Sequence, residues 1–214
     1  MADIFDEVEE DLRAERMRRL LSRYGSLLIG AALLVLLGVA GLQGWRWYEA
    51  RGAAQAAGAY LAAGRDAAQP NADTKAIAQR YDALAAGAPE GYRTLARLRA
   101  AALKAEWGDR AGALADWDAV ARDGGTDALY RGLATLLWAL HALDGGDAAA
   151  IESRLAPLAE GPWRASVEEV RALAAMQRND TATAKRLLTG LRGDIQAPQG
   201  VRDRAGRLLA ELGG

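Results

Sequence analysis

The residues with the strongest capacity for acid–base or nucleophilic chemistry are few and scattered. His141 is the only histidine, and it lies among apolar residues in a predicted helix over Leu133 to Leu143. A lone histidine in such a setting is more often a packed or surface residue than a metal ligand or a general base. The G-x-S-x-G context of a hydrolase nucleophile is missing at all four serines, Ser22, Ser26, Ser153 and Ser166. The sequence therefore indicates no hydrolase site.

Two pairs of carboxylates have the residue types for general acid–base work, Glu168-Glu169 and Asp116/Asp118. On a helix, however, adjacent residues point apart, and residues two positions apart do not face one another. We interpret both pairs as solvated helix faces. The glycine pairs at 124–125 and 145–146 lack the spacing and the following Lys-Ser/Thr of a phosphate-binding loop. Cysteine is absent, which excludes disulfides, thiolate nucleophiles and sulfur-ligated metals. We expect a protein that is not an enzyme and has no cofactor or metal.

Charge is almost balanced along the chain. Of the 27 basic and 28 acidic residues, 21 basic and 20 acidic follow residue 50. Such a balance offers no electrostatic footprint for nucleic acid, so we expect no nucleic-acid partner. The length of 214 residues fits one ordinary domain with additional segments.

One stretch is too apolar for an ordinary soluble domain. Residues 25–44 carry no charge, and a helix that continues to residue 48 would be about 34 Å long, enough to span a bilayer. A buried core helix of this length would need a larger protein around it. A cleavable signal is disfavoured because 23 residues, seven of them acidic, precede the stretch and no clean small-x-small site follows. We expect a retained transmembrane helix over residues 24–48.

The residues that should mark this anchor are aromatic rings at its two ends and small residues within it. Amphipathic rings favour the headgroup region, and small residues allow another transmembrane helix to approach, which would permit self-association. The predicted anchor residues are Tyr24, Gly25, Gly38, Gly41, Gly44, Trp45, Trp47 and Tyr48.

Basic residues crowd the N-terminal flank of the stretch, and fewer follow it. By the positive-inside rule this bias predicts a cytoplasmic N-terminus and an exported C-terminal domain. The predicted topology-setting residues are Arg13, Arg16, Arg18, Arg19 and Arg23. Residues 1–23 should form a short cytoplasmic amphipathic helix, interpreted as a solvated juxtamembrane segment or, alternatively, as a docking element.

After residue 48 the chain repeats itself. The unit over residues 91–124 recurs 38 residues later, where Tyr130 corresponds to Tyr92 and Leu133 to Leu95, and a third copy follows after 33 residues. An earlier second helix contains Tyr81, and its first helix would cover residues 49–67. Such helix pairs expose apolar stripes that only neighbouring pairs can cover. Residues 49–214 are therefore predicted to form a helical repeat domain.

The breaks between the helices have their own sequence signals. At Gly108-Asp109 and at Gly146-Asp147, glycine should adopt the left-handed conformation that ends the first helix. At both of these breaks and at Asn179-Asp180, aspartate should cap the following helix. Pro157 should kink or end a second helix, and the segment after Pro198 should form a capping helix. Four tryptophans are interpreted as packing residues, with a role as partner-binding anchors as the alternative: Trp107, Trp117, Trp138 and Trp163.

The turn Gly108-Asp109 with Ala113 and Trp117 behind it resembles the tetratricopeptide repeat. With the acidic-then-arginine opening IFDEVEEDLRAERMRRLLSRYG and the span that ends in GWRWY, nearly the whole chain resembles the bacterial YfgM-like family. The resemblance implies an all-α fold: a single N-terminal transmembrane helix, then a tetratricopeptide-like array of about four helix pairs plus a C-terminal capping helix.

The same resemblance implies a function and a location. Members are single-pass proteins of the bacterial inner membrane whose repeat domain is periplasmic. They are ancillary to the Sec translocon and contact a periplasmic membrane-anchored chaperone. We therefore expect a membrane-anchored scaffold whose partners are translocon subunits, a periplasmic chaperone or exported clients, besides the lipid bilayer. The alternatives are a scaffold for another envelope or cell-division complex, and a membrane tether for a soluble enzyme.

Overall fold

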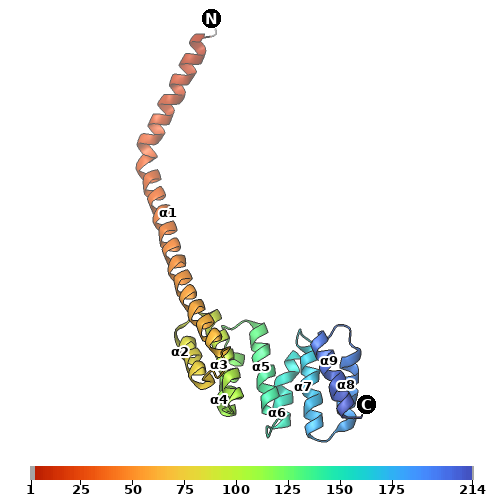
Figure 1. Cartoon of the computed structure of the whole chain (residues 1–214). Helices are drawn as coiled ribbons and strands as arrows, with labels where there is room; N and C mark the ends of the chain where they lie inside the picture. The colour runs from red at the N-terminus through yellow and green to blue at the C-terminus, as the bar shows by residue number, and fades with distance from the viewer. Residues whose placement is uncertain (1–2, 214) are drawn as a thin grey trace. The chain divides into compact units, whose positions relative to one another are not determined.

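In the computed structural model the backbone is described for residues 3–213 and the side chains for residues 22–213. Within this part of the chain every regular element is a helix (Figure 1). In order they are α1 (Asp3–Ala67), α2 (Thr74–Gly87), α3 (Glu90–Glu106), α4 (Arg110–Arg122), α5 (Ala128–Ala142), α6 (Ala148–Leu155), the 3₁₀ turn η1 (Ala156–Leu158), α7 (Arg164–Gln177), α8 (Thr181–Gly193) and α9 (Gln199–Glu211). The predicted all-α fold is confirmed. The chain divides into two compact units, Met1–Gly52 and Ala53–Gly214.

The first unit contains helix α1 up to Gly52. Its apolar side chains are uncovered, with Leu34 at 72% and Leu37 at 69% exposure. The helical stretch Ser22–Ala67 contains a window that is long and apolar enough to cross a membrane, and none of that window is buried. The predicted N-terminal apolar helix is thus confirmed, and by length and composition it is a candidate membrane span or signal anchor.

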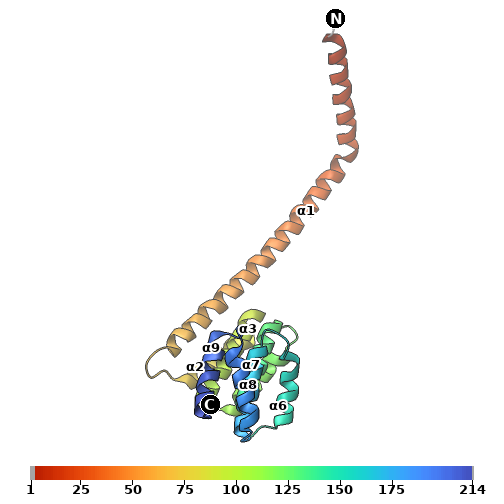
Figure 2. The same cartoon turned by 90° about the vertical axis from the view of Figure 1, so that its right-hand side faces the viewer.

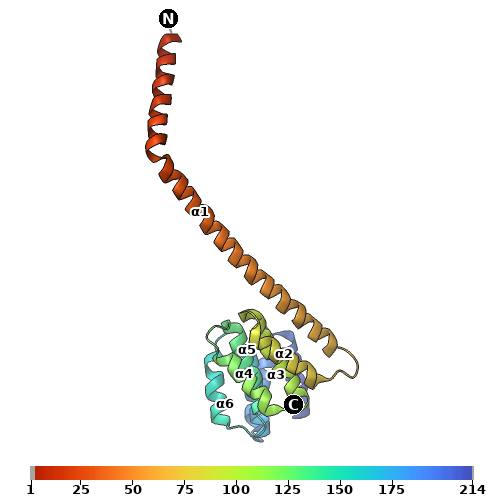
Figure 3. The ribbon, with the colours of Figure 1, turned by 90° about the vertical axis from the view of Figure 1, so that its left-hand side faces the viewer.

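The second unit is a row of helices in which each helix packs mainly on its neighbours in the sequence. Figure 2 looks along the row from the end formed by α8 and α9, and Figure 3 looks from the end formed by α2. Residues 53–67 of α1 pair with α2, α3 pairs with α4, α5 with α6, and α7 with α8. Helix α9 covers the last pair. The predicted four pairs with a capping helix are confirmed.

The hydrophobic core is divided into four clusters that follow one another along the row. Each cluster joins three successive helices, from α1–α2–α3 at one end to α7–α8–α9 at the other. The large residues of the second helices lie at the cluster centres, where Tyr81, Trp117, Leu155 and Leu188 are all almost completely buried. These four residues lie 36, 38 and 33 residues apart in the sequence, so their burial agrees with the repeat periods.

The breaks between first and second helices combine a left-handed residue with an aspartate cap. Gly108 has a φ of 91° and Asn179 a φ of 59°. The carboxylate of Asp109 accepts a hydrogen bond from the Gly112 amide at 2.9 Å, and equivalent caps begin α2, α6 and α8. One detail differs from the prediction. At the break before α6 the left-handed residue is Gly145, one position earlier than Gly146.

Helix α6 is the shortest helix of the array. It ends at Leu155, and residues 156–158 tighten into a 3₁₀ turn that contains Pro157. Proline lacks the amide hydrogen and its ring crowds the preceding turn, so an α-helix cannot continue through it without distortion. The prediction that Pro157 ends or kinks this helix is confirmed.

Candidate protein-binding site

Helix α5 presents an apolar face that nothing in the described part of the chain covers completely. Leu129 is 51% exposed, Tyr130 is 39% exposed and Leu140 is 40% exposed, and the half-buried Leu133 and Leu137 lie between them. Positions 130, 133, 137 and 140 follow the spacing of three and four residues that places side chains on one side of a helix. We refer to these five residues as the α5 face.

Leu133, Leu137 and Leu140 of the α5 face, together with Leu136, form one wall of a groove with a volume of about 490 Å³, and Leu129 and Tyr130 lie outside its lining. The opposite walls come from α7 and α9, which contribute Leu173, Leu208 and the indole of Trp163 from the turn before α7. The helical walls of this groove thus come from α5 and α7, the first helices of the last two pairs, and from the capping helix α9. Helix α7 packs on both α5 and α9. An apolar groove of this size is typical of a site that holds side chains of a bound molecule.

Trp163 reaches the groove because its neighbour on α5 has no side chain. A Cβ atom at Gly132 would lie 2.4 Å from the indole Nε1 and 2.6 Å from Cδ1. The Trp163 Nε1 is buried and has no hydrogen-bond partner among the described residues. Glycine lowers the intrinsic stability of helix α5 at position 132, but its missing side chain leaves room for the indole ring, which lines the groove.

An ion pair between a buried carboxylate and a half-exposed guanidinium joins α7 to α9 at the rim of the groove. Glu169 on α7 is only 9% exposed, and its two carboxylate oxygens accept hydrogen bonds from Arg204 of α9 at 2.5 and 2.7 Å. These hydrogen bonds raise the pKa of Arg204 above its ordinary value. The interpretation of Glu168-Glu169 as a solvated face is wrong for Glu169, because a cation on another helix pairs with it.

The interpretation of Asp116/Asp118 as a solvated face is also wrong, because cations on other helices pair with both carboxylates. Asp116 lies 2.6 Å from the Lys104 ammonium, and Asp118 binds the guanidinium of Arg154 on α6. Burial raises the pKa of Asp116, and the hydrogen bond from Lys104 opposes that shift. Both carboxylates therefore hold neighbouring helices together.

His141 is a packing residue. Its ring stacks on the buried indole of Trp117, with the ring centroids 4.6 Å apart. Burial lowers the pKa of His141 below its ordinary value, and the nearby Arg110 lowers it further. The position therefore favours the neutral imidazole.

Of the four tryptophans, Trp117 is a core residue with 1% exposure, whereas Trp163 lines the groove. Trp138 lies under the guanidinium of Arg154 at 3.9 Å, and Trp107 packs at the edge of the first core cluster. The packing interpretation agrees with all four positions, since Trp163 packs on the third core cluster and its Nε1 is buried, and Trp163 also lines the groove. The sequence did not single out the α5 face, although the apolar spacing was visible there.

The predicted anchor residues lie in α1, and all of them except the half-buried Gly25 are exposed. Trp45 is 63% exposed, Trp47 is 61% exposed and Tyr48 is 71% exposed, and Arg51 lies over the Trp47 ring at 5.2 Å. At the other end Arg23 lies 5.9 Å from the centroid of the Tyr24 ring. Added Cβ atoms would meet nothing within 4 Å at Gly25, Gly38, Gly41 and Gly44. Their roles at a membrane remain predictions. The side chains of four predicted topology-setting residues lie outside the described residues, namely Arg13, Arg16, Arg18 and Arg19.

Stacked helix pairs that bury a continuous row of small cores define an α-helical repeat protein. The chain belongs to the tetratricopeptide repeat-like domain family, whose model matches residues 18–187. No curated protein and no solved structure matches the chain. Tetratricopeptide-like domains generally mediate protein–protein interactions.

Proposed function

We propose that the protein is a membrane-anchored scaffold that binds other proteins through the groove between α5, α7 and α9. The observation that carries this proposal is the α5 face, because leucines left open to water on a repeat array lose the stabilisation that burial would give. Burial of an exposed leucine side chain contributes about 1.5–3 kcal/mol. A partner that covers Leu129, Tyr130 and Leu140 would recover part of that free energy.

The proposed arrangement has three segments: a cytoplasmic amphipathic segment over residues 1–23, a transmembrane helix over residues 24–48, and a periplasmic repeat domain over residues 49–214. The exposed leucines of α1 support the span, and the basic N-terminal flank supports the orientation. A bacterial inner membrane is the proposed location. The scaffold would lack catalytic activity of its own.

The finer proposal is that this scaffold serves protein export, ancillary to the Sec translocon and to periplasmic chaperones. Its support is the resemblance of the N-terminal segment, the span and the repeats to the YfgM-like family. The partners would then be translocon subunits, a chaperone or exported clients. Self-association through the small residues of the span is a further proposal, since the four glycines leave its surface open.

Site-specific photo-crosslinking in native membranes tests both levels of the proposal. A photo-reactive residue replaces Leu140 on the α5 face, and the matched control replaces the exposed Thr189 on α8, which does not line the α5 groove. Crosslinks from position 140 that are absent from position 189 are expected, with translocon or chaperone components among them. Equal crosslinking from both positions would exclude the groove as the binding site.

The identity of the crosslinked proteins separates the export proposal from the alternatives. Envelope or cell-division proteins, recovered without any translocon or chaperone component, would replace the export role with a scaffold for those complexes. A single soluble enzyme would replace it with a tether.

A further inference from the structure

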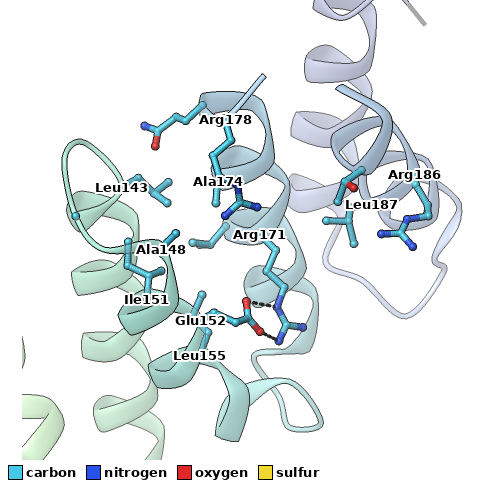
Figure 4. A pocket seen from close by; sticks show the side chains of 14 residues that line it. Leu143, Ala148, Ile151, Glu152, Leu155, Arg171, Ala174, Arg178, Arg186 and Leu187 are labelled. Carbon is cyan, nitrogen blue, oxygen red and sulfur yellow. Dashed lines mark hydrogen bonds and ion pairs between the residues drawn. The ribbon is translucent and has the colours of Figure 1, made fainter. Parts of the chain in front are cut away.

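A second groove lies between α6, α7 and α8, and it shares only Val170 with the α5 groove. Its volume is about 350 Å³. Helix α6, which forms one side of the groove, ends at Leu155. We call its aliphatic lining the floor, which consists of Leu143, Ile151, Leu155, Val170, Ala174 and Leu187. Figure 4 labels all of these residues except Val170.

The rim of this second groove is positively charged. Arg171 and Arg178 come from α7 and the turn after it, and Arg186 comes from α8 on the other side. The carboxylate of Glu152 binds Arg171, as the dashed lines in Figure 4 show. Arg178 and Arg186 make no ion pair within the described residues. The carboxylate of Asp180, which caps α8, accepts a hydrogen bond from the Thr183 amide at 3.0 Å. This hydrogen bond lowers the pKa of Asp180, and the charges of Arg178 and Arg186 lower it further.

We propose that this groove binds a segment of a partner protein in which acidic side chains flank an aliphatic one. The floor fits an aliphatic side chain, and the two unpaired guanidiniums fit carboxylates on either side of it. A guanidinium presents several N–H donors in a plane, so it binds carboxylates well even at a partly wet rim. This site is separate from the α5 groove, and the proposal does not rest on the function proposed for that groove.

An anionic lipid offers the same combination of charge and apolar surface. The family to which the chain belongs favours a protein segment instead, because tetratricopeptide-like domains generally mediate protein–protein interactions.

The experiment uses the full chain in phosphatidylcholine nanodiscs and fluorescence anisotropy. The probe is a fluorescein-labelled peptide, acetylated and amidated at its ends, in which two leucines lie between pairs of glutamates. A second peptide has glutamine in place of every glutamate. The test variant combines Arg178→Gln with Arg186→Gln. The matched control is Arg192→Gln, which removes an exposed arginine of α8 that does not line the groove.

We expect the acidic peptide to bind the wild-type chain and the test variant to bind it about tenfold more weakly, since two partly exposed ion pairs are lost. Arg192→Gln and the α5 variant Leu140→Gln should leave the affinity for the acidic peptide unchanged. The experiment therefore tests the second groove independently of the function proposed for the α5 groove. The proposal is overturned by equal binding of the acidic and glutamine peptides, by no binding, or by an equal loss in Arg192→Gln. Displacement of the acidic peptide by phosphatidylglycerol vesicles would assign the groove to a lipid instead.

Discussion

The contact between Gly132 and Trp163 permits a test of how the α5 groove is built. Replacement of Gly132 by alanine adds one methyl group in the middle of α5. In an ordinary exposed helix this change stabilises the protein, because glycine is about 1 kcal/mol less favourable than alanine. Here the new Cβ would lie 2.4 Å from the indole Nε1 of Trp163.

The expected sign follows from comparing the two effects. A Cβ contact at that distance requires a shift of the indole or of α5, and overpacking of this kind costs about 1–3 kcal/mol. The loss exceeds the propensity gain, so we expect Gly132→Ala to lower the free energy of unfolding by about 1 kcal/mol. The matched control is Gly206→Ala in α9, where the nearest atom is the flexible Arg192 Cδ at 3.8 Å. That variant should gain about 0.5–1 kcal/mol.

Urea denaturation of the full chain in detergent micelles, followed by tryptophan fluorescence, measures both variants. A change in midpoint at constant m reports a change in stability. The sign should reverse on a Trp163→Leu background, because the ring that meets the new methyl group is gone and only the propensity gain remains. If Gly132→Ala stabilises the chain as much as Gly206→Ala with Trp163 present, the close contact does not exist and this account of the groove is wrong.

Three further outcomes are expected. Asp109→Ala should lower the free energy of unfolding by about 1 kcal/mol in urea denaturation, because the cap to Gly112 is lost, whereas Asp109→Asn should stay near wild type; equal losses would refute the capping role. The pKa of His141 is lowered from 6.5 in the folded chain. Its contribution to stability should therefore be complete above about pH 6.5 and fall as the pH drops through the folded pKa. Urea denaturation at pH 7.5 and 5 should show a larger loss of unfolding free energy in wild type than in His141→Gln, and an equal loss in both would contradict this. A reporter active only in the periplasm should work when fused after Gly214, and activity of a cytoplasmic reporter there instead would reverse the proposed orientation.

The repeat register was predictable because it depends on local rules. Apolar spacing, a left-handed residue and an aspartate cap recur at each break, and each acts within a few residues of itself. Helices α4 and α8 therefore begin directly after Asp109 and Asp180, as predicted. The shift from Gly146 to Gly145 shows the limit of such rules, since two adjacent glycines can both adopt the left-handed conformation and packing decides between them.

The open face of α5 was not predictable in this way. Tyr130 and Leu133 correspond to Tyr92 and Leu95 of the preceding repeat, so the pattern treats them alike. What differs is how far neighbouring helices cover each position, and that depends on helices distant in the sequence. The prediction of a solvated Glu169 was wrong for a related reason, because helix geometry within α7 alone does not reveal a partner on α9. Its partner Arg204 lies one repeat period away, and opposite charges at that separation were the sequence signal for such pairs.

The short helix α6 has a consequence for how cooperatively the array unfolds. One ion pair joins Arg154 of α6 to Asp118 of α4, and another joins Glu152 of α6 to Arg171 of α7. Helix α6 packs less extensively on its neighbours than the other second helices do. In a linear array each interface acts only between neighbours, so the weakest one determines where cooperativity ends. The amides of α2–α4 and those of α7–α9 should therefore exchange their hydrogens as two blocks, and rising salt should uncouple the blocks before either one melts.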